Sequence, residues 1–182
     1  WKLLLGAVYK MVIAAGAYKV MGYFDTGTAW YHWVGYAYAY GIYLFFDFAG
    51  YSLMAVGSSY MLGIETPENF RQPFISRDIR EFWDRWHITL SHWFRDFIFT
   101  RFVMYSSKKK WFSTRLQRAC AGFFVDMGIM GLWHGITPSY ILYGLYHGLL
   151  LAATETYQKK SKFYKKHKNK TWYQVISWAV TM

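Results

Sequence analysis

The sequence predicts an all-α protein that crosses a membrane several times. Apolar runs of the length that a spanning helix needs, roughly 20 residues, recur along the chain. Aromatic residues make up 23% of it, far above an average soluble domain, and the 10 Trp and 17 Tyr are types enriched at membrane interfaces. Basic clusters lie directly beside the apolar runs. We therefore interpret residues 1–182 as one membrane-embedded region, an internal piece of a longer multi-pass protein.

The positive charge favours a cytoplasmic membrane face over a nucleic-acid surface. The formal net charge of +11 is concentrated within residues 108–118 and 159–170. Both clusters border apolar segments, as cytoplasmic loops do under the positive-inside rule, whereas a nucleic-acid surface needs no such flanks. Cys120 is the only cysteine, so no internal disulfide is possible. It is either a small buried residue or a thiol that relays an acyl group.

Two apolar segments open the chain. Residues 3–24 form a predicted transmembrane helix. Residues 29–64 exceed one straight crossing, so they predict either one membrane helix with a break near Gly41 or Gly50 or two membrane helices. Asp47 lies within the second segment and should face the protein interior or a water-filled cavity, either in a structural ion pair or in a catalytic role.

An aromatic segment with both charge signs follows, at residues 78–105. Its mixed charge argues against a full crossing, so we expect interfacial or re-entrant helices. Glu81 and Arg85 are four residues apart and can form an ion pair on a helix. Read as one helix, the segment places His87 in an aromatic wall, because large apolar residues recur at three- and four-residue steps, at Trp83, Trp86, Leu90, Trp93, Phe94 and Phe97.

Residues 119–153 predict a membrane hairpin whose turn carries His134. Two apolar runs meet there, and basic clusters flank both outer ends. Pro138 interrupts the helix and frees backbone groups near His134, which is tolerated at membrane depth only inside protein or beside a cavity. Residues 172–182 form the start of a further transmembrane helix.

His134 is the strongest catalytic candidate, and a metal site is not expected. An imidazole in an apolar span needs a partner, and burial favours the neutral form that a general base requires. A histidine satisfied by a neighbouring carbonyl explains the same residue equally well. His87 and His92 are five residues apart and point about 140° away from each other on a helix. No spacing of histidine and cysteine suits zinc.

Three short runs, in order, resemble the membrane-bound O-acyltransferase family. They are residues 86–91 (WHITLS), 93–96 (WFRD) and 131–135 (GLWHG), and the resemblance extends from about residue 65 to 170. It is most similar to the branch that D-alanylates lipoteichoic acid in the Gram-positive cell envelope. The resemblance implies a multi-pass protein of the bacterial cell membrane, with helices around a central tunnel. It also implies that His134 is catalytic, with His87 as the second characteristic polar position.

The resemblance also implies substrates and partners. D-Alanine would arrive as a thioester on the phosphopantetheine of a small carrier protein in the cytoplasm, with no cofactor bound by this chain. Lipoteichoic acid, or a partner protein on the outer side, would accept it, and nucleic acid would not take part. Carrier proteins are generally acidic, so we expect docking on a basic surface with an apolar centre. The expected residues are Arg101, Val103, Met104, Lys108, Lys109 and Lys110, for which a lipid-facing stop-transfer cluster is the alternative.

Other functions compete with this interpretation. Polysaccharide O-acetyltransferases of the alginate type share these runs, but their usual proline-leucine-glycine-glycine phrase is replaced here by residues 100–105 (TRFVMY). A transporter or channel would also bury His134, Asp47 and Asp126 around a water-filled path. A structural membrane scaffold explains neither the aromatic segment nor the intramembrane histidine. Direct transfer to teichoic acid and relay through a serine of a partner protein both remain open.

Overall fold

The computed structural model describes residues 1–182, and every regular element in it is helical, which confirms the all-α prediction. The chain divides into two compact units, residues 1–69 and 70–182, each described by itself. The first contains α1 (Lys2–Ala7), the π-helical η1 (Val8–Ala14), α2 (Ala15–Asp25) and α3 (Trp30–Met61). The second contains η2 (Pro73–Ile75), α4 (Ile79–Trp83), α5 (Ile88–Phe94), the π-helical η3 (Arg95–Phe99), α6 (Thr100–Lys108), α7 (Arg115–His134), α8 (Pro138–Lys160), α9 (Lys162–His167) and α10 (Thr171–Thr181).

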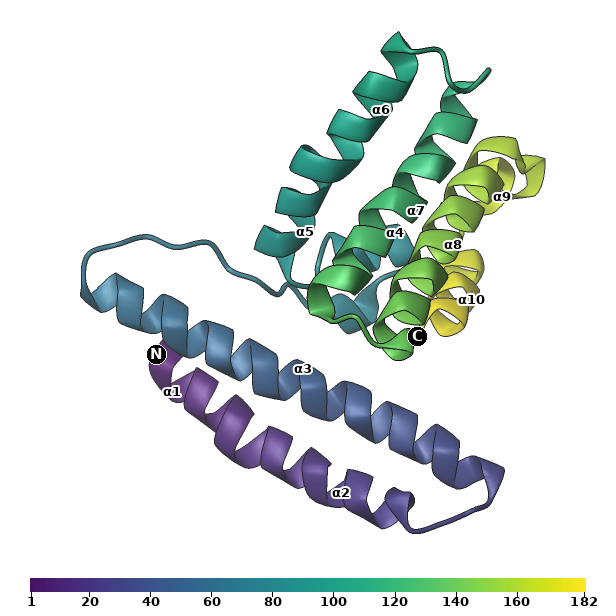
Figure 1. Ribbon diagram of the computed structural model, residues 1–182. Coiled ribbons are helices and arrows are strands. Elements are labelled where there is room, and N and C mark those ends of the chain that lie inside the picture. The colour runs from purple at the N-terminus through teal and green to yellow at the C-terminus, as the bar shows by residue number, and fades with distance from the viewer. The chain divides into compact units, whose positions relative to one another are not determined.

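The first unit is a helical hairpin (Figure 1). One arm runs through α1, η1 and α2, the other is α3, and both arms are long and apolar enough to cross a membrane. Glycines let the backbones approach, because a Cβ on Gly6 would lie 2.6 Å from the Gly50 carbonyl oxygen. The break expected near Gly41 or Gly50 is absent, and α3 continues through both residues. Gly50 serves the helix crossing instead.

An ion pair joins the two arms of this hairpin. The Lys10 ammonium lies 2.5 Å from Asp47 Oδ1, and Lys10 belongs to the π-helical turn of its arm. The Tyr9 and Phe46 rings meet edge to face beside it, with centroids 5.0 Å apart. The structural pairing of Asp47 is therefore confirmed. A charged side chain on an apolar helix is tolerated when an opposite charge lies in contact with it.

The core of the second unit forms where α4 and α5 meet the α7–α8 pair. Its buried side chains are Trp83, Phe94, Met127, Met130 and Leu151. Helices α7 and α8 run side by side, as Figure 1 shows in green. Their backbones approach closely at two glycines that face each other, since a Cβ on either Gly131 or Gly144 would lie within 3.2 Å of the other's Cα.

Local signals set the ends of α7 and α8. Thr114 and Gln117 form a capping box, in which the Thr114 hydroxyl accepts from the Gln117 N–H and the Gln117 side chain accepts from the Thr114 N–H. At the other end, α7 stops at His134 because Gly135 takes an extended backbone that the helix cannot continue. Pro138 then opens α8, at a position where its missing N–H costs nothing. The turn between the helices thus spans residues 135–137.

The aromatic segment is not one helix, contrary to the periodicity argument. Helix α4 ends at Trp83 and α5 begins at Ile88, with the chain turning between them. His87 stands at this junction in the left-handed conformation, with φ 43° and ψ 55°. The Phe82 and Trp86 rings stack at 5.5 Å across the turn. The regularly spaced aromatic residues therefore pack around the turn at His87 and do not form one face of a continuous helix.

Candidate functional site

His134 is the last residue of α7 and lies at the tip of the α7–α8 hairpin. Three aromatic rings surround its imidazole. Tyr140 stacks on it at a centroid distance of 5.7 Å and an interplanar angle of 20°, and Tyr143 meets it edge-on at 5.8 Å. Trp133 packs against it at 4.9 Å. The aromatic rings of α8 fix the plane of the imidazole, whereas the residue itself is exposed.

His87 is half-buried, and its imidazole lies within electrostatic range of His134. Burial lowers the pKa of His87 below its ordinary value, and the charge of His134 lowers it further. The ring also stacks with Phe70 at 6.4 Å and an angle of 30°. His87 is therefore neutral at pH 7, able to donate from one ring nitrogen and accept at the other. The charge of one histidine thus acts on the other, whereas their shared role in one site stays a prediction.

The left-handed backbone at His87 predicts which side chains can replace it without loss of stability. Because asparagine tolerates this conformation and β-branched residues do not, His87→Val should be less stable than His87→Asn by about 1–2 kcal/mol. Both variants lose the imidazole, so the difference between their stabilities reports the cost of the left-handed backbone conformation. The measurement is the thermal unfolding midpoint of the full-length protein in detergent. Equal midpoints for the two variants would contradict a left-handed residue at this position.

A network of arginines and carboxylates holds α4 and so positions the turn that carries His87. Asp78 caps α4, because its Oδ1 accepts from the backbone N–H groups of Arg80 and Glu81. Glu81 accepts from Arg77 Nε at 3.1 Å and from Arg85 Nη2 at 2.8 Å. The predicted pairing of Glu81 with Arg85 is confirmed. Arg85 sits two residues before His87, so this network restrains the site.

The network predicts acid sensitivity. Burial raises the pKa of Glu81, but hydrogen bonds from the Arg77 backbone and from the Arg85 and Arg77 side chains outweigh it and leave the pKa below 4.5. The carboxylate therefore stabilises the fold above pH 4.5, and this contribution disappears as pH falls through the lowered value. Glu81→Gln should cost about 1 kcal/mol at pH 7 and flatten the decline below pH 4.5. Thermal unfolding midpoints from pH 7 to pH 3 test this, and parallel curves would contradict it.

A second aromatic layer lies behind His134. The Tyr143 ring contacts His147 at 4.6 Å, and His147 meets the Trp83 indole edge-on at 5.3 Å. His147 Nδ1 and Trp83 Nε1 are buried without a hydrogen-bond partner. His147 therefore packs within this aromatic layer. Since Trp83 ends α4, this layer connects the turn bearing His87 to the hairpin bearing His134.

Sequence reasoning missed a charged cavity of about 350 Å³ in the same unit. Arg80 and Lys159 both pair with the buried Glu155, Lys159 at 2.6 Å. Asp126 also lines the cavity and buries one carboxylate oxygen without a partner. The i,i+4 spacing of Glu155 and Lys159 was a signal for their pairing. Arg80 was not predictable, because it lies 75 residues away from Glu155.

The predicted docking residues lie on α6 and just beyond its end. Arg101, Met104 and Lys108 are spaced three and four residues apart, so they share one helix face, and all three are exposed. Val103 does not join them, because it packs against Gly122 of α7. The remaining members, Lys109 and Lys110, are exposed where the helix ends, and Lys109 lies over the Tyr105 ring. The exposed surface is thus basic with an apolar centre.

Comparison with known proteins gives one consistent family. The sequence model of the membrane-bound O-acyltransferase family matches residues 23–182. A teichoic acid D-alanyltransferase of Bacillus subtilis (strain 168) is 42% identical over 186 residues, 99% of this chain and 46% of the relative. One from Lacticaseibacillus rhamnosus is 50% identical over 136 residues, 75% of the chain and 33% of the relative. A probable alginate O-acetylase of Pseudomonas syringae pv. tomato is 40% identical over 156 residues, 86% of this chain and 27% of the relative. The chain spans less than half the length of these relatives.

Proposed function

Because the chain belongs to the membrane-bound O-acyltransferase family, we propose that the whole protein transfers D-alanine to a hydroxyl acceptor in teichoic acid synthesis. The observation that carries the proposal is the 42–50% identity to teichoic acid D-alanyltransferases. The proposed location is the bacterial cell membrane, crossed several times. The two arms of the first unit are candidate spans, and the interfacial or re-entrant helices would surround a tunnel.

His134 is the proposed general base. It accepts the proton of the acceptor hydroxyl as that oxygen attacks the D-alanyl carbonyl of a phosphopantetheine thioester. The new C–O bond forms, the C–S bond breaks, and the carrier's sulfur leaves as a thiol after receiving the proton. The Tyr140 and Tyr143 rings support this role, because they hold the imidazole in one plane. Their exposed hairpin tip would be covered by the rest of the protein.

His87 is the proposed electrophilic partner. A neutral imidazole donates one N–H, which suits a negative charge that develops on the thioester oxygen. Burial and the neighbouring His134 both favour the neutral form of His87. The left-handed backbone at His87 supports a functional constraint, since strained backbone concentrates at functional sites.

The exposed face of α6 is the proposed docking surface for the carrier protein. Reversing two charges, Arg101→Glu with Lys108→Glu, should weaken carrier binding roughly tenfold at low salt, because an acidic partner would then meet like charge. The same reversal on α9, Lys165→Glu with Lys166→Glu, is the matched control and should change binding little. Binding of the acylated carrier to the full-length protein in nanodiscs measures both. An equal loss in both variants would reassign the effect to overall charge.

The alginate O-acetylase relatives give a second candidate, O-acetylation of a polysaccharide. The deciding experiment reconstitutes the full-length protein in vesicles with D-alanyl carrier or an acetyl donor. Consumption of the D-alanyl thioester, with D-alanine recovered as an ester, supports the proposal. Consumption of the acetyl donor alone supports O-acetylation. A transporter would move substrate while the acylated carrier stays intact.

A further inference from the structure

We propose that a groove between α8, α9 and α10 binds one acidic glycerophospholipid from the cytoplasmic leaflet. The groove has an apolar chamber of about 520 Å³ and, beside it, a polar chamber of about 190 Å³. Both are lined by Asp78, Tyr164, Tyr173 and Ser177, so the two chambers adjoin. An amphipathic ligand fits this arrangement, with one of its two acyl chains in the apolar chamber and its phosphate in the polar one.

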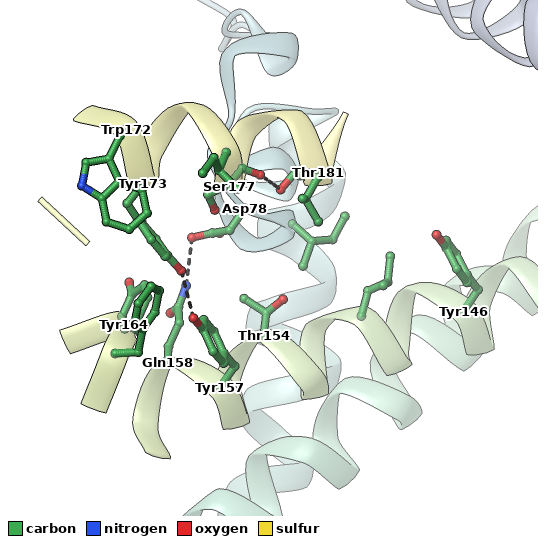
Figure 2. A pocket seen from close by; sticks show the side chains of 15 residues that line it. Asp78, Tyr146, Thr154, Tyr157, Gln158, Tyr164, Trp172, Tyr173, Ser177 and Thr181 are labelled. Carbon is green, nitrogen blue, oxygen red and sulfur yellow. Dashed lines mark hydrogen bonds between the residues drawn. The ribbon is translucent and has the colours of Figure 1, made fainter. Parts of the chain in front are cut away.

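The apolar chamber is built from aromatic and aliphatic side chains of α8 and α10 (Figure 2). Ile176 and Val180 line it from α10, and both are more than half exposed. Tyr146 and Leu150 line it from α8, and Trp172 lines it from the first turn of α10. Apolar side chains gathered in one groove favour a hydrocarbon occupant over water.

The floor of the groove is closed by hydrogen bonds. Gln158 Nε2 donates to Asp78 Oδ2 at 2.9 Å, and the Tyr173 hydroxyl donates to the Tyr157 hydroxyl at 3.4 Å, as Figure 2 shows. Asp78 Oδ1 is already occupied by the start of α4. The Asp78 carboxylate is therefore held by hydrogen bonds from neutral groups and keeps its negative charge, so the attraction for an anion must come from the lysines around the groove.

The polar chamber is lined by two cations, Arg77 and Lys168, and by two carboxylates, Asp78 and Glu81. The Glu81 oxygens are occupied by Arg77 and Arg85, so Lys168 is the cation that remains for a phosphate. Lys168 is exposed and makes no ion pair. An anionic headgroup would supply the missing partner for Lys168.

The surroundings favour a lipid as the occupant. Lysines 159–170 place a dense positive field around α9, and such clusters beside apolar helices attract the acidic lipids of the cytoplasmic leaflet. Aromatic residues at the mouth are typical of the membrane interface. The inference depends on membrane location but not on the acyl group transferred. A failure of lipid binding would therefore leave the proposed reaction untouched, and a failure of acyl transfer would leave the lipid site untouched.

Two pairs of variants of the full-length protein test the site. Lys168→Gln removes the lining charge, and Lys166→Gln removes a charge of α9 that lies outside both chambers. Thr154→Trp fills the apolar chamber, and Ala153→Trp adds the same ring at the neighbouring exposed position. Native mass spectrometry of delipidated protein, titrated with phosphatidylglycerol or with phosphatidylcholine of identical chains, measures the affinities.

We expect phosphatidylglycerol to bind more tightly than phosphatidylcholine. Lys168→Gln should lower only the phosphatidylglycerol affinity, about fivefold, and Thr154→Trp should weaken both lipids. The two control variants should match the wild type. Equal losses in Lys166→Gln and Lys168→Gln would overturn the proposal in favour of a diffuse surface charge. A photo-crosslinker at position 154 that captures a protein segment and not a lipid would overturn it as well.

Discussion

Replacing His134 with alanine should reduce D-alanyl transfer by about 10²–10⁴-fold, the usual contribution of a positioned general base. The acceptor hydroxyl then keeps its proton and attacks the thioester poorly. Carrier binding should not change, because His134 lies at the hairpin tip and the proposed docking face lies on α6. The measurement is transfer from acylated carrier in vesicles, with carrier affinity and protein abundance determined on the same preparations.

The matched control is His167→Ala, which removes an imidazole from α9. The His167 ring contacts the Phe163 carbonyl oxygen at 2.9 Å and belongs to the lysine-rich helix, so transfer should stay near the wild-type rate. Near-normal transfer in His134→Ala would move the role of base to His87. A loss of carrier binding in His134→Ala would mean that the variant reports on folding and not on proton transfer.

Sequence reasoning located the hairpin turn because the chemistry there is local. Pro138, which was expected to interrupt the helix, begins α8, and this signal is read from a single residue. The pairing of Glu81 with Arg85 was also predictable from an i,i+4 spacing. These predictions required no knowledge of the fold.

The errors arose where tertiary contacts decide the backbone. His87 fitted a helical period, yet its left-handed conformation places α4 and α5 on different axes, with the Phe82 and Trp86 rings stacked across the turn. The predicted break in α3 failed for a related reason, since Gly50 packs against Gly6 and needs no kink. Glu155 meets Arg80 only because α8 packs on α4. The periodicity of the sequence does not predict contacts between residues that lie far apart along the chain.

Gly144→Ala should destabilise the α7–α8 hairpin by about 1–3 kcal/mol, although alanine is the better helix former. A Cβ at this position would lie 2.4 Å from the Met127 carbonyl oxygen, and backbone cannot move aside as a side chain can. The helices must separate, which shifts the α8 rings that hold His134. We therefore expect a lower thermal unfolding midpoint together with slower transfer.

Gly128→Ala is the matched control, because the same substitution on α7 would meet no atom within 4 Å. There the lower chain entropy of the unfolded state should make alanine neutral or stabilising by up to about 1 kcal/mol. Opposite signs for the two substitutions would tie the effect to the helix contact and not to glycine itself. If Gly144→Ala instead matched Gly128→Ala in stability and transfer, close contact at Gly144 would not be what places Tyr140 and Tyr143 against His134.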